Sequence, residues 1–400
     1  MGREMKDSGV EWIGEIPKNW EIKKLKNVSE INSGEYISKE DYALQGTFDI
    51  IGSNGKIGKI NKTNISKKVI TTGRVGSIGT CRIVQNAWIT DNALIIETKK
   101  NILLDYLAYI IPMFPYEIIS IGTAQPLITA TILKNQYIPY SNLCDQQKIA
   151  DFLDEKCTEL DNVIEKTHAS IEEYKKLKQA VITQAVTQGI RDNREMIDSG
   201  IEWIGEIPSE WKIIRIKWVL NERKEKSENG GEEPLSMSQK YGIIPTKEME
   251  MIPNMASSFI GAKIVYSGDL VFNKLKAHLG VFAVSQYNGI VSPDYAVYCS
   301  KGIADVKYLE YLFKTPQYIA EFKKKSSGVG AGLTRLYTDE LYSIYCLLPS
   351  WNEQEEIICY LNKKIKEIDN LIEKKEQYLS EIENYKESLI YEYVTGKKEV

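Results

Sequence analysis

The chain contains one 18-residue segment twice, and this duplication constrains its architecture more than any other feature. Residues 3–20 read REMKDSGVEWIGEIPKNW and residues 194–211 read REMIDSGIEWIGEIPSEW, so 14 of 18 aligned positions match at an offset of 191. A second pair of similar segments follows at an offset of 208, with DNVIEK from Asp161 against DNLIEK from Asp369. The stretches between these segments differ. Alternating constant and variable segments predict one repeated frame that holds two different domains.

Length and composition favour several domains and a location in the cytoplasm. With 400 residues and 43% apolar content, the chain can form two or three hydrophobic cores. We find no uninterrupted apolar stretch of about 18 residues, and the first residues are polar and charged. We therefore expect no membrane partner.

Cysteine and histidine are too sparse and too scattered for a zinc site. The six cysteines include no CxxC pair, and the only histidines are His168 and His278. This spacing predicts reduced, mostly buried thiols and no bound metal.

The net charge of −4 conceals a segregation of charge along the chain. Residues 18–144 carry 15 Lys and Arg against 10 Asp and Glu, and residues 209–350 carry 18 against 15. Residues 145–187 hold 6 basic against 9 acidic side chains, and residues 352–394 hold 6 against 11. Since binding to phosphate depends on local positive potential, the variable segments are the better candidates for contact with a polyanion.

The segments that start near residues 145 and 353 are predicted to be long helices. Both are rich in Glu, Lys, Leu and Ile, and neither contains Pro or Gly before Gly189 and Gly396, which are typical helix stops. Apolar residues recur at heptad spacing over five to six heptads, with Thr167 and Lys178 as breaks, which predicts a coiled coil. The predicted seam includes Leu153, Leu160, Ile164 and Ile171 in the first helix, and Leu361, Ile365, Ile368, Ile372, Ile382 and Leu389 in the second.

The two helices most simply pair with each other, because each has a narrow apolar seam and both belong to one chain. A pseudo-twofold relation between the halves makes this pair antiparallel, with the variable domains at opposite ends. At ~1.5 Å per residue, about 43 residues span roughly 65 Å. A coiled coil between two copies of the chain is the alternative.

The variable segments are predicted to be mixed α+β domains. In the first, Asn54-Gly55 forms a hairpin turn, and strands follow at residues 69–72, 81–84 and 93–98. In the second, strands are expected around residues 268–274, 281–284 and 295–298. Short helices are expected at residues 103–111 and 306–314.

We find no set of residues for catalysis. Ser292-Pro-Asp-Tyr lacks the second proline of an amino-methyltransferase motif, and the glycines from Gly52 to Lys59 miss the P-loop spacing. No Glu-x-Lys or Asp-x-Lys follows Pro293-Asp294 as a nuclease would require. We therefore expect a protein without enzymatic activity and without a cofactor.

These features together resemble the specificity subunits of type I restriction-modification systems. The resemblance covers nearly the whole chain and is carried by the doubled SG-x-EWIGEIP, by the helix starts DQQKIADFLDEK and NEQEEIICYLNKK, and by the helix ends AVTQG and YVTGK. The segment GDLVFNKLK from Gly268 also looks like a recurrent pattern of the family's recognition domains.

The resemblance implies an α+β fold in which two pseudo-twofold-related target-recognition domains are separated by an antiparallel coiled coil. The domains would comprise residues 1–144 and 191–351, and the spacer helices residues 145–190 and 352–396. Each domain would read one half of a bipartite double-stranded DNA sequence. The helices would set the spacing and dock two methyltransferase subunits, which restriction subunits would join, and the cofactors of those subunits should not bind this chain.

One loop departs from the family pattern. A Gly-x-Gly-Gln-Pro-like loop commonly precedes each helix; here it reads Gly122-Thr-Ala-Gln-Pro in the first copy and Gly330-Ala-Gly-Leu-Thr-Arg in the second. The contacts of the second loop therefore cannot be inferred from those of the first.

Candidate DNA contacts lie on or beside glycine-rich turns, where short loops can approach a groove. Arg74 and Arg335 are the predicted base readers because arginine can donate two hydrogen bonds to guanine, and Lys323 to Lys325 are predicted to contact phosphates. The candidates are Ser53, Asn54, Lys56, Arg74, Ser77, Thr123 and Gln125 in the first domain, and Lys274, Lys276, His278, Lys323, Lys324, Arg335 and Tyr337 in the second.

Trp12, Trp20, Trp203 and Trp211 of the doubled segment are predicted to pack rather than to stack on bases, because a duplex offers no unstacked base. The main alternative function is a coiled-coil scaffold that joins two binding modules without DNA.

Overall fold

The computed structural model describes residues 3–122, 125–238, 241–249, 259–328 and 334–400. The backbone divides into two compact units, of which unit 1 comprises Met1–His168 with Gln377–Val400 and unit 2 comprises Ala169–Glu376. Each unit therefore contains a sheet domain and parts of two long helices.

The long helices are α5 (Leu143–Thr187) and α10 (Trp351–Val394). Neither contains Gly or Pro, so the hydrogen-bond ladder of each continues without interruption. Gly189 and Gly396 follow them with φ of 82° and 72°, the left-handed conformation that ends a helix.

In unit 1, the start of α5 runs antiparallel to the end of α10. The ring of Phe152 lies 4.4 Å from that of Tyr393, and Lys386 Nζ lies 2.5 Å from Asp161 Oδ1. Residue numbers therefore increase along α5 in the direction in which they decrease along α10.

Unit 2 repeats this arrangement with the helices exchanged. Lys178 Nζ lies 2.7 Å from Asp369 Oδ1, and the Lys375 ammonium lies 5.7 Å from the centre of the Tyr174 ring. Lys178 and Asp369 occupy the positions that Lys386 and Asp161 occupy in unit 1, each shifted by 208 residues (386 − 178 and 369 − 161). The predicted antiparallel pairing is confirmed within each unit.

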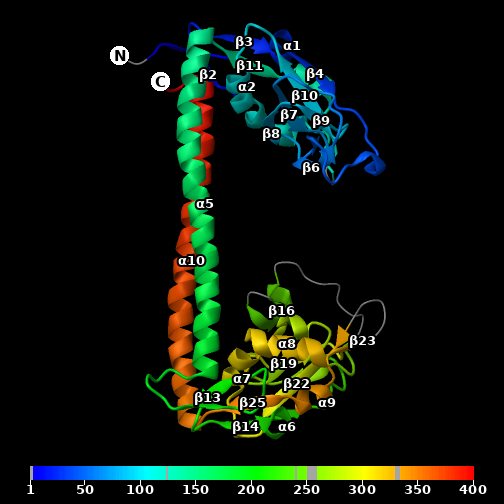
Figure 1. Ribbon diagram of the computed structural model, residues 1–400, viewed down its shortest axis with the longest axis vertical. Helices are drawn as coiled ribbons and strands as arrows, with labels where there is room; N and C mark the ends of the chain where they lie inside the picture. The colour runs from blue at the N-terminus through cyan, green and yellow to red at the C-terminus, as the bar shows by residue number, and fades with distance from the viewer. Residues whose placement is uncertain (1–2, 123–124, 239–240, 250–258, 329–333) are drawn as a thin grey trace. The chain divides into compact units, whose positions relative to one another are not determined.

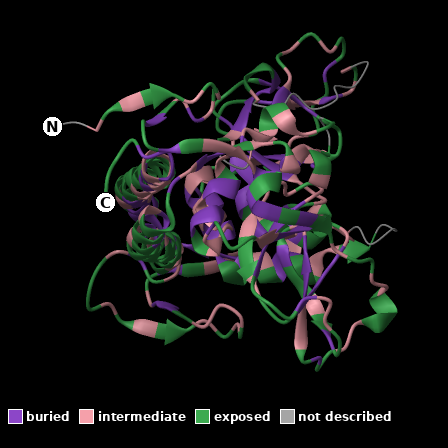
Figure 2. Cartoon of the chain, turned by 90° about the horizontal axis from the view of Figure 1, so that it is seen from above, coloured by how far each residue is buried: buried purple, intermediate pink, exposed green. Residues whose placement is uncertain are grey.

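Along both long helices, buried positions recur between exposed ones (Figure 2). The two predicted breaks keep their polar groups satisfied, because the Thr167 hydroxyl donates to the Val163 carbonyl at 2.7 Å and Lys178 pairs with Asp369. Among the predicted seam residues, Leu153, Ile171, Leu361, Ile368, Ile382 and Leu389 are buried, and Leu160, Ile164, Ile365 and Ile372 are half-buried.

Unit 1 contains a four-stranded antiparallel sheet in the order β4-β10-β7-β8 and a three-stranded sheet in the order β6-β5-β9 (Figure 1). The predicted strands at residues 69–72, 81–84 and 93–98 are confirmed as β7, β8 and β10. The strands are β1 (Met5–Asp7), β2 (Glu15–Pro17), β3 (Glu21–Lys24), β4 (Ser29–Ser33), β5 (Phe48–Gly52), β6 (Gly55–Ile60), β7 (Val69–Gly73), β8 (Cys81–Val84), β9 (Ala87–Ile89), β10 (Ala93–Thr98) and β11 (Tyr137–Tyr140). The short helices are α1 (Leu25–Val28), η1 (Lys39–Asp41), α2 (Leu104–Ile110), η2 (Ile111–Met113), α3 (Tyr116–Ile119) and α4 (Ala130–Lys134).

Unit 2 contains the same four-stranded arrangement, in the order β15-β22-β19-β20, and several two-stranded pairs. Its strands are β12 (Met196–Asp198), β13 (Glu206–Pro208), β14 (Lys212–Arg215), β15 (Leu220–Glu222), β16 (Leu235–Ser238), β17 (Gly242–Pro245), β18 (Lys263–Val265), β19 (Leu270–Asn273), β20 (Phe282–Val284), β21 (Gly289–Val291), β22 (Tyr295–Ser300), β23 (Ser327–Gly328), β24 (Thr334–Arg335) and β25 (Tyr345–Leu348). Its short helices are α6 (Ile216–Val219), η3 (Thr246–Glu248), η4 (Ala277–Leu279), α7 (Val306–Phe313), α8 (Pro316–Lys325) and α9 (Thr338–Ser343). The predicted α+β class with two related domains is confirmed.

A buried tyrosine joins the sheet domain of each unit to the end of a long helix. The Tyr106 hydroxyl donates to the carbonyl of Val394 at 3.1 Å in unit 1. In unit 2, the Tyr308 hydroxyl donates to the carbonyls of Val186 and Leu347, both at 3.3 Å. Burial raises the pKa of both phenols, so both remain donors.

The doubled segment forms a joint in each unit, but the two joints differ in strength. In unit 2, the Arg194 guanidinium binds the Glu353 carboxylate, and their side chains are only 6% and 4% exposed. In unit 1, Arg3 lies 3.9 Å from Asp145, with side chains 25% and 28% exposed. Because aspartate is one methylene shorter than glutamate, the Arg3–Asp145 distance is longer, and both side chains of this pair are more exposed to water.

The tryptophans of the doubled segment pack in the core of their own unit, as predicted. Trp20 and Trp211 are 1% and 5% exposed. Trp12 meets the ring of Phe114 edge-on at 5.6 Å. Trp20 and Trp211 are therefore buried anchors of the sheet domains, and Trp12 and Trp203 are half-buried against the same cores.

Candidate nucleic-acid interface

In unit 1, the candidate contacts gather at the sheet edge where β7 ends and β10 begins. Arg74 directly follows β7, and its Nη1 donates to the Asp91 carbonyl at 3.2 Å. The carbonyl of Arg74 accepts a hydrogen bond from Ile128 N at 2.9 Å, and Gly76 N donates to the Pro126 carbonyl at 3.0 Å. These bonds bring the exposed Gln125 to the same edge as Arg74.

The β5–β6 hairpin reaches the same edge. The Ser53 hydroxyl donates to the Val75 carbonyl at 2.7 Å, and the Thr80 hydroxyl donates to the carbonyls of Ser53 and Ser77 at 2.8 and 3.0 Å. The backbone is so close here that a Cβ on Gly73 would lie 1.9 Å from the Ser77 carbonyl oxygen. A glycine is therefore required at this position.

Two other predicted residues of unit 1 lie further along the hairpin. Asn54 is exposed at its tip, and Lys56 is exposed on β6 with its ammonium 2.8 Å from Asp49 Oδ1. Thr123 lies outside the described residues. The structure thus brings together Ser53, Arg74, Ser77 and Gln125, with Asn54 and Lys56 on the adjoining hairpin.

Unit 2 presents the equivalent edge, where β19 ends and β22 begins. Lys274 follows β19 as Arg74 follows β7, and its carbonyl accepts from Leu336 N at 3.0 Å as that of Arg74 accepts from Ile128 N. Arg335 Nη2 donates to Asp294 Oδ1 at 2.6 Å. Lys274, Arg335 and Asp294 therefore form one cluster.

The cluster changes the acidity of Lys274. Burial, with a smaller contribution from the nearby positive charge of Lys263, lowers the pKa of the Lys274 ammonium. A phosphate close to this side chain would compensate for the lost hydration and restore the charged form.

The other predicted residues of unit 2 surround this edge. Lys276 is exposed at the start of η4, and His278 within η4 is half-buried. Lys323 and Lys324 are exposed at the end of α8, just before β23, whose Ser327 pairs with Arg335 of β24. Tyr337, 44% exposed, follows that strand.

Two contacts at these edges were not predicted from the sequence, that of the Asp294 carboxylate with Arg335 and that of the Asp91 carbonyl with Arg74. The sequence pattern linked Asp294 only to methyltransferase and nuclease motifs that it does not complete, and it gave no indication of the Asp91 carbonyl. The signal that could have found both is positional: each belongs to a short polar turn before an apolar strand, in Thr90-Asp-Asn and Ser292-Pro-Asp.

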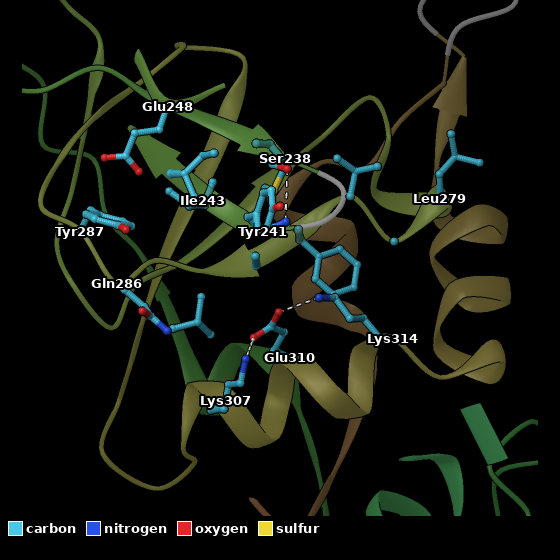
Figure 3. Close-up of a pocket in the computed structure, with 18 residues that line it drawn as sticks. Ser238, Tyr241, Ile243, Glu248, Leu279, Gln286, Tyr287, Lys307, Glu310 and Lys314 are labelled. Carbon is cyan, nitrogen blue, oxygen red and sulfur yellow. Dashed lines mark hydrogen bonds and ion pairs between the residues drawn. The ribbon is translucent and has the colours of Figure 1, made fainter. Parts of the chain in front are cut away.

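A cavity of 940 Å³ in unit 2 lies between the β16–β17 hairpin, β20 and α7 (Figure 3). At its floor, Glu310 is 4% exposed and lies 2.7 Å from Lys307 Nζ and 2.6 Å from Lys314 Nζ. These two ammonium groups outweigh the effect of burial and lower the pKa of Glu310. The three charged groups at the floor are paired with one another, with Glu310 between the two lysines.

The described residues contain no group of His, Cys, Asp or Glu that could hold a metal ion. Within the same residues, no helix is long and apolar enough to span a membrane. All six cysteines are unpaired thiols, but only Cys157 and Cys346 are buried, so the prediction of mostly buried thiols is wrong.

Comparisons with known proteins identify the class. Residues 17–173 match the family model described as the type I restriction modification DNA specificity domain. Two relatives from Methanocaldococcus jannaschii span 96% of this chain: a provisionally named type I restriction enzyme MjaX specificity subunit, 25% identical over 95% of its length, and the MjaVIII specificity subunit, 23% identical over 93%.

The fold agrees with these relatives. A solved chain, reported under complex assembly and conformational transition of the type I R-M system, has a TM-score of 0.67 at 13% identity, covering 96% of this chain and 99% of that one. The segment 17–173 is therefore similar in sequence to the DNA specificity domain, and the whole chain is similar in fold to the solved one. Over nearly its whole length the chain is similar to type I restriction-modification specificity subunits, and DNA sequence recognition rather than a DNA-independent scaffold is the function that these findings support.

Proposed function

We propose that this chain reads a bipartite double-stranded DNA sequence, with one target-recognition domain in each unit. The observation that carries this proposal is the repeated sheet edge. Both edges hold basic and polar side chains on a shared backbone frame, Arg74 with Gln125 in one and Lys274 with Arg335 in the other. The same frame with different side chains is what two readers of different half-sites require.

The recognition domains would comprise residues 1–144 and 191–351, and the spacer helices residues 145–190 and 352–396. Arg74 and Arg335 would read bases. Lys323 and Lys324, exposed at the end of a helix, would bind phosphates. The other candidates at the two edges, Ser53, Asn54, Lys56, Ser77, Thr123, Gln125, Lys274, Lys276, His278 and Tyr337, would supply further contacts. The chain itself would be non-catalytic, and it would act in the cytoplasm, where its DNA target lies.

We further propose that the long helices dock two methyltransferase subunits, which restriction subunits join in the full complex. In unit 1, Val163 of α5 and Tyr378 and Tyr385 of α10 are 37%, 51% and 57% exposed. The two tyrosines lie seven residues apart and so share one helix face. In unit 2, Leu177 and Leu371 are 48% and 43% exposed. Exposed apolar side chains at this spacing suit a partner helix.

Docking can be tested by changing this face. Replacing both Tyr378 and Tyr385 by Glu should abolish co-purification of a co-expressed methyltransferase subunit, because burying two carboxylates in an apolar interface is unfavourable. Ser380→Glu, which adds a charge at an exposed position on another face of α10, is the matched control. Equal retention of the partner by all variants would contradict the docking surface.

DNA recognition can be tested by sequencing methylated bases in cells that express the chain with its methyltransferase. One bipartite motif, methylated on opposite strands in its two halves, is expected. Binding by the purified complex should weaken steeply as salt increases, because lysine and arginine contacts release counterions from the phosphates. A continuous motif without an unread spacer, or DNA binding that does not depend on salt, would contradict the proposal.

A further inference from the structure

The two units use the same turn to enter the central strand of their four-stranded sheet. In unit 1, Ala93 N donates to the Thr90 carbonyl at 3.0 Å at the start of β10. In unit 2, Tyr295 N donates to the Ser292 carbonyl at 3.0 Å at the start of β22. Since β10 and β22 occupy the same place in the strand order, these two turns are structurally equivalent.

Each turn holds one arginine, but the arginines come from different segments. Arg74 follows β7, whereas the residue in its place after β19 is Lys274. Arg335 instead belongs to β24. The next residue, Leu336, donates its N–H to the Lys274 carbonyl, as Ile128 does to the Arg74 carbonyl. A guanidinium is therefore present at both turns although the aligned residue differs.

The two arginines are held by groups of different charge. Arg74 is held by a neutral carbonyl, that of Asp91, at 3.2 Å. Arg335 is held by the carboxylate of Asp294 at 2.6 Å, a charge-assisted bond that is shorter and stronger. Asp294 is 64% exposed, while the Arg335 side chain is 25% exposed. An exposed carboxylate on a surface that meets phosphates weakens DNA binding unless it has another role.

We propose that Asp294 is a positioning residue that fixes the Arg335 guanidinium for reading a guanine. This inference rests on the proposed function and adds the residue that sets specificity at one base pair. With Nη2 held by Asp294 and Nε buried, the side chain is confined to one orientation, and the other N–H groups of Nη1 and Nη2 can face the base without a further loss of conformational freedom. A bidentate arginine discriminates guanine from other bases by roughly 5- to 150-fold.

The inference predicts two opposite effects of Asp294→Asn. Preference for the guanine read by Arg335 should fall about tenfold, because a neutral amide holds the guanidinium less firmly. Affinity for random DNA should stay equal or rise, because one negative charge is removed from the binding surface. A residue that only stabilised the fold would instead weaken binding to all sequences when changed.

The test uses the chain assembled with its methyltransferase subunits and a library of randomised duplexes. Base preferences are measured position by position for the wild type, Asp294→Asn, Asp294→Glu and Arg335→Ala. Asp294→Asn and Arg335→Ala should relax the same base pair, and Asp294→Glu should retain part of the preference. Asp339→Asn, which removes an exposed carboxylate from α9, is the control and should leave that base pair unchanged.

The outcomes separate this inference from the proposed function. No sequence preference in the wild-type complex would overturn the proposed function itself. A defined wild-type motif that Asp294→Asn leaves intact would overturn only the positioning role. Relaxation of a different base pair from that of Arg335→Ala would show that Asp294 contacts a base directly, which also overturns the positioning role.

Discussion

The ion pair between Arg194 and Glu353 gives the sharpest test of how the joint is stabilised. Both side chains are less than 10% exposed, at 6% and 4%, so Glu353→Gln leaves a buried guanidinium without its main counter-ion. Breaking a buried pair in this way costs about 3 to 5 kcal/mol. Glu210, 3.3 Å from Arg194 Nη2, is 62% exposed and compensates little.

The equivalent change in unit 1 should be nearly silent. Arg3 and Asp145 are 3.9 Å apart and partly hydrated, so Asp145→Asn should cost at most about 1 kcal/mol. For a unit the size of Ala169–Glu376, the loss in Glu353→Gln corresponds to a drop in Tm of roughly 6 to 20 °C.

Calorimetry of the two variants beside the wild type would measure this difference. Replacing both Arg194 and Glu353 by Leu should recover most of the lost stability, because no buried charge then remains unpaired. Equal Tm shifts for Glu353→Gln and Asp145→Asn would refute the argument from burial, as would a double replacement no more stable than the single one.

Three further predictions concern single positions. Tyr308→Phe removes the buried hydroxyl at the joint of unit 2 and should cost about 1 kcal/mol in urea unfolding; an unchanged midpoint would show that the hydroxyl is not needed. In the free protein, burial and the charge of Lys263 lower the pKa of Lys274, whereas a bound DNA phosphate should raise it. The affinity for DNA should therefore be highest at pH values below the pKa of the free protein, and it should fall as the pH rises through that pKa. DNA affinity measured at a series of pH values and constant salt should fall in this way for the wild type but not for Lys274→Arg. The same pH dependence in both proteins would contradict the prediction. Gly73→Ala places a Cβ 1.9 Å from the Ser77 carbonyl oxygen. In a selection from randomised duplexes it should weaken base preference in the half-site bound by unit 1 and leave the other half-site unchanged; unchanged preference in both would refute the prediction.

Much of the fold could be predicted from local sequence patterns. The long helices follow from the absence of Gly and Pro and from the heptad spacing of apolar residues, and β7, β8 and β10 follow from short apolar runs between turns. The sequence did not predict how the polar breaks Thr167 and Lys178 satisfy their hydrogen bonds. Thr167 bonds to a carbonyl one turn earlier and Lys178 to a carboxylate on the other helix, and these contacts are set by the three-dimensional packing.

The candidate interface could be predicted only in part. Glycine turns correctly indicated segments that meet at one edge in unit 1. The spatial counterpart of Arg74 is Lys274, however, and the guanidinium of Arg335 reaches the equivalent turn from a strand 61 residues later (335 − 274). Such an equivalence depends on the sheet register and on a contact between distant segments, which no local pattern contains.

The division of the chain into units has a consequence for its biosynthesis. Unit 2 is one continuous run, Ala169–Glu376, whereas unit 1 also requires Gln377–Val400. Leu389 and Val394 from that last stretch are buried in the same core as Trp20 and Leu153. On the ribosome, the domain that is translated first is therefore the last that can complete its core, because Leu389 and Val394 emerge after all its other core residues. A stop codon shortly after residue 376 would therefore remove part of the core of the domain encoded at the other end of the gene.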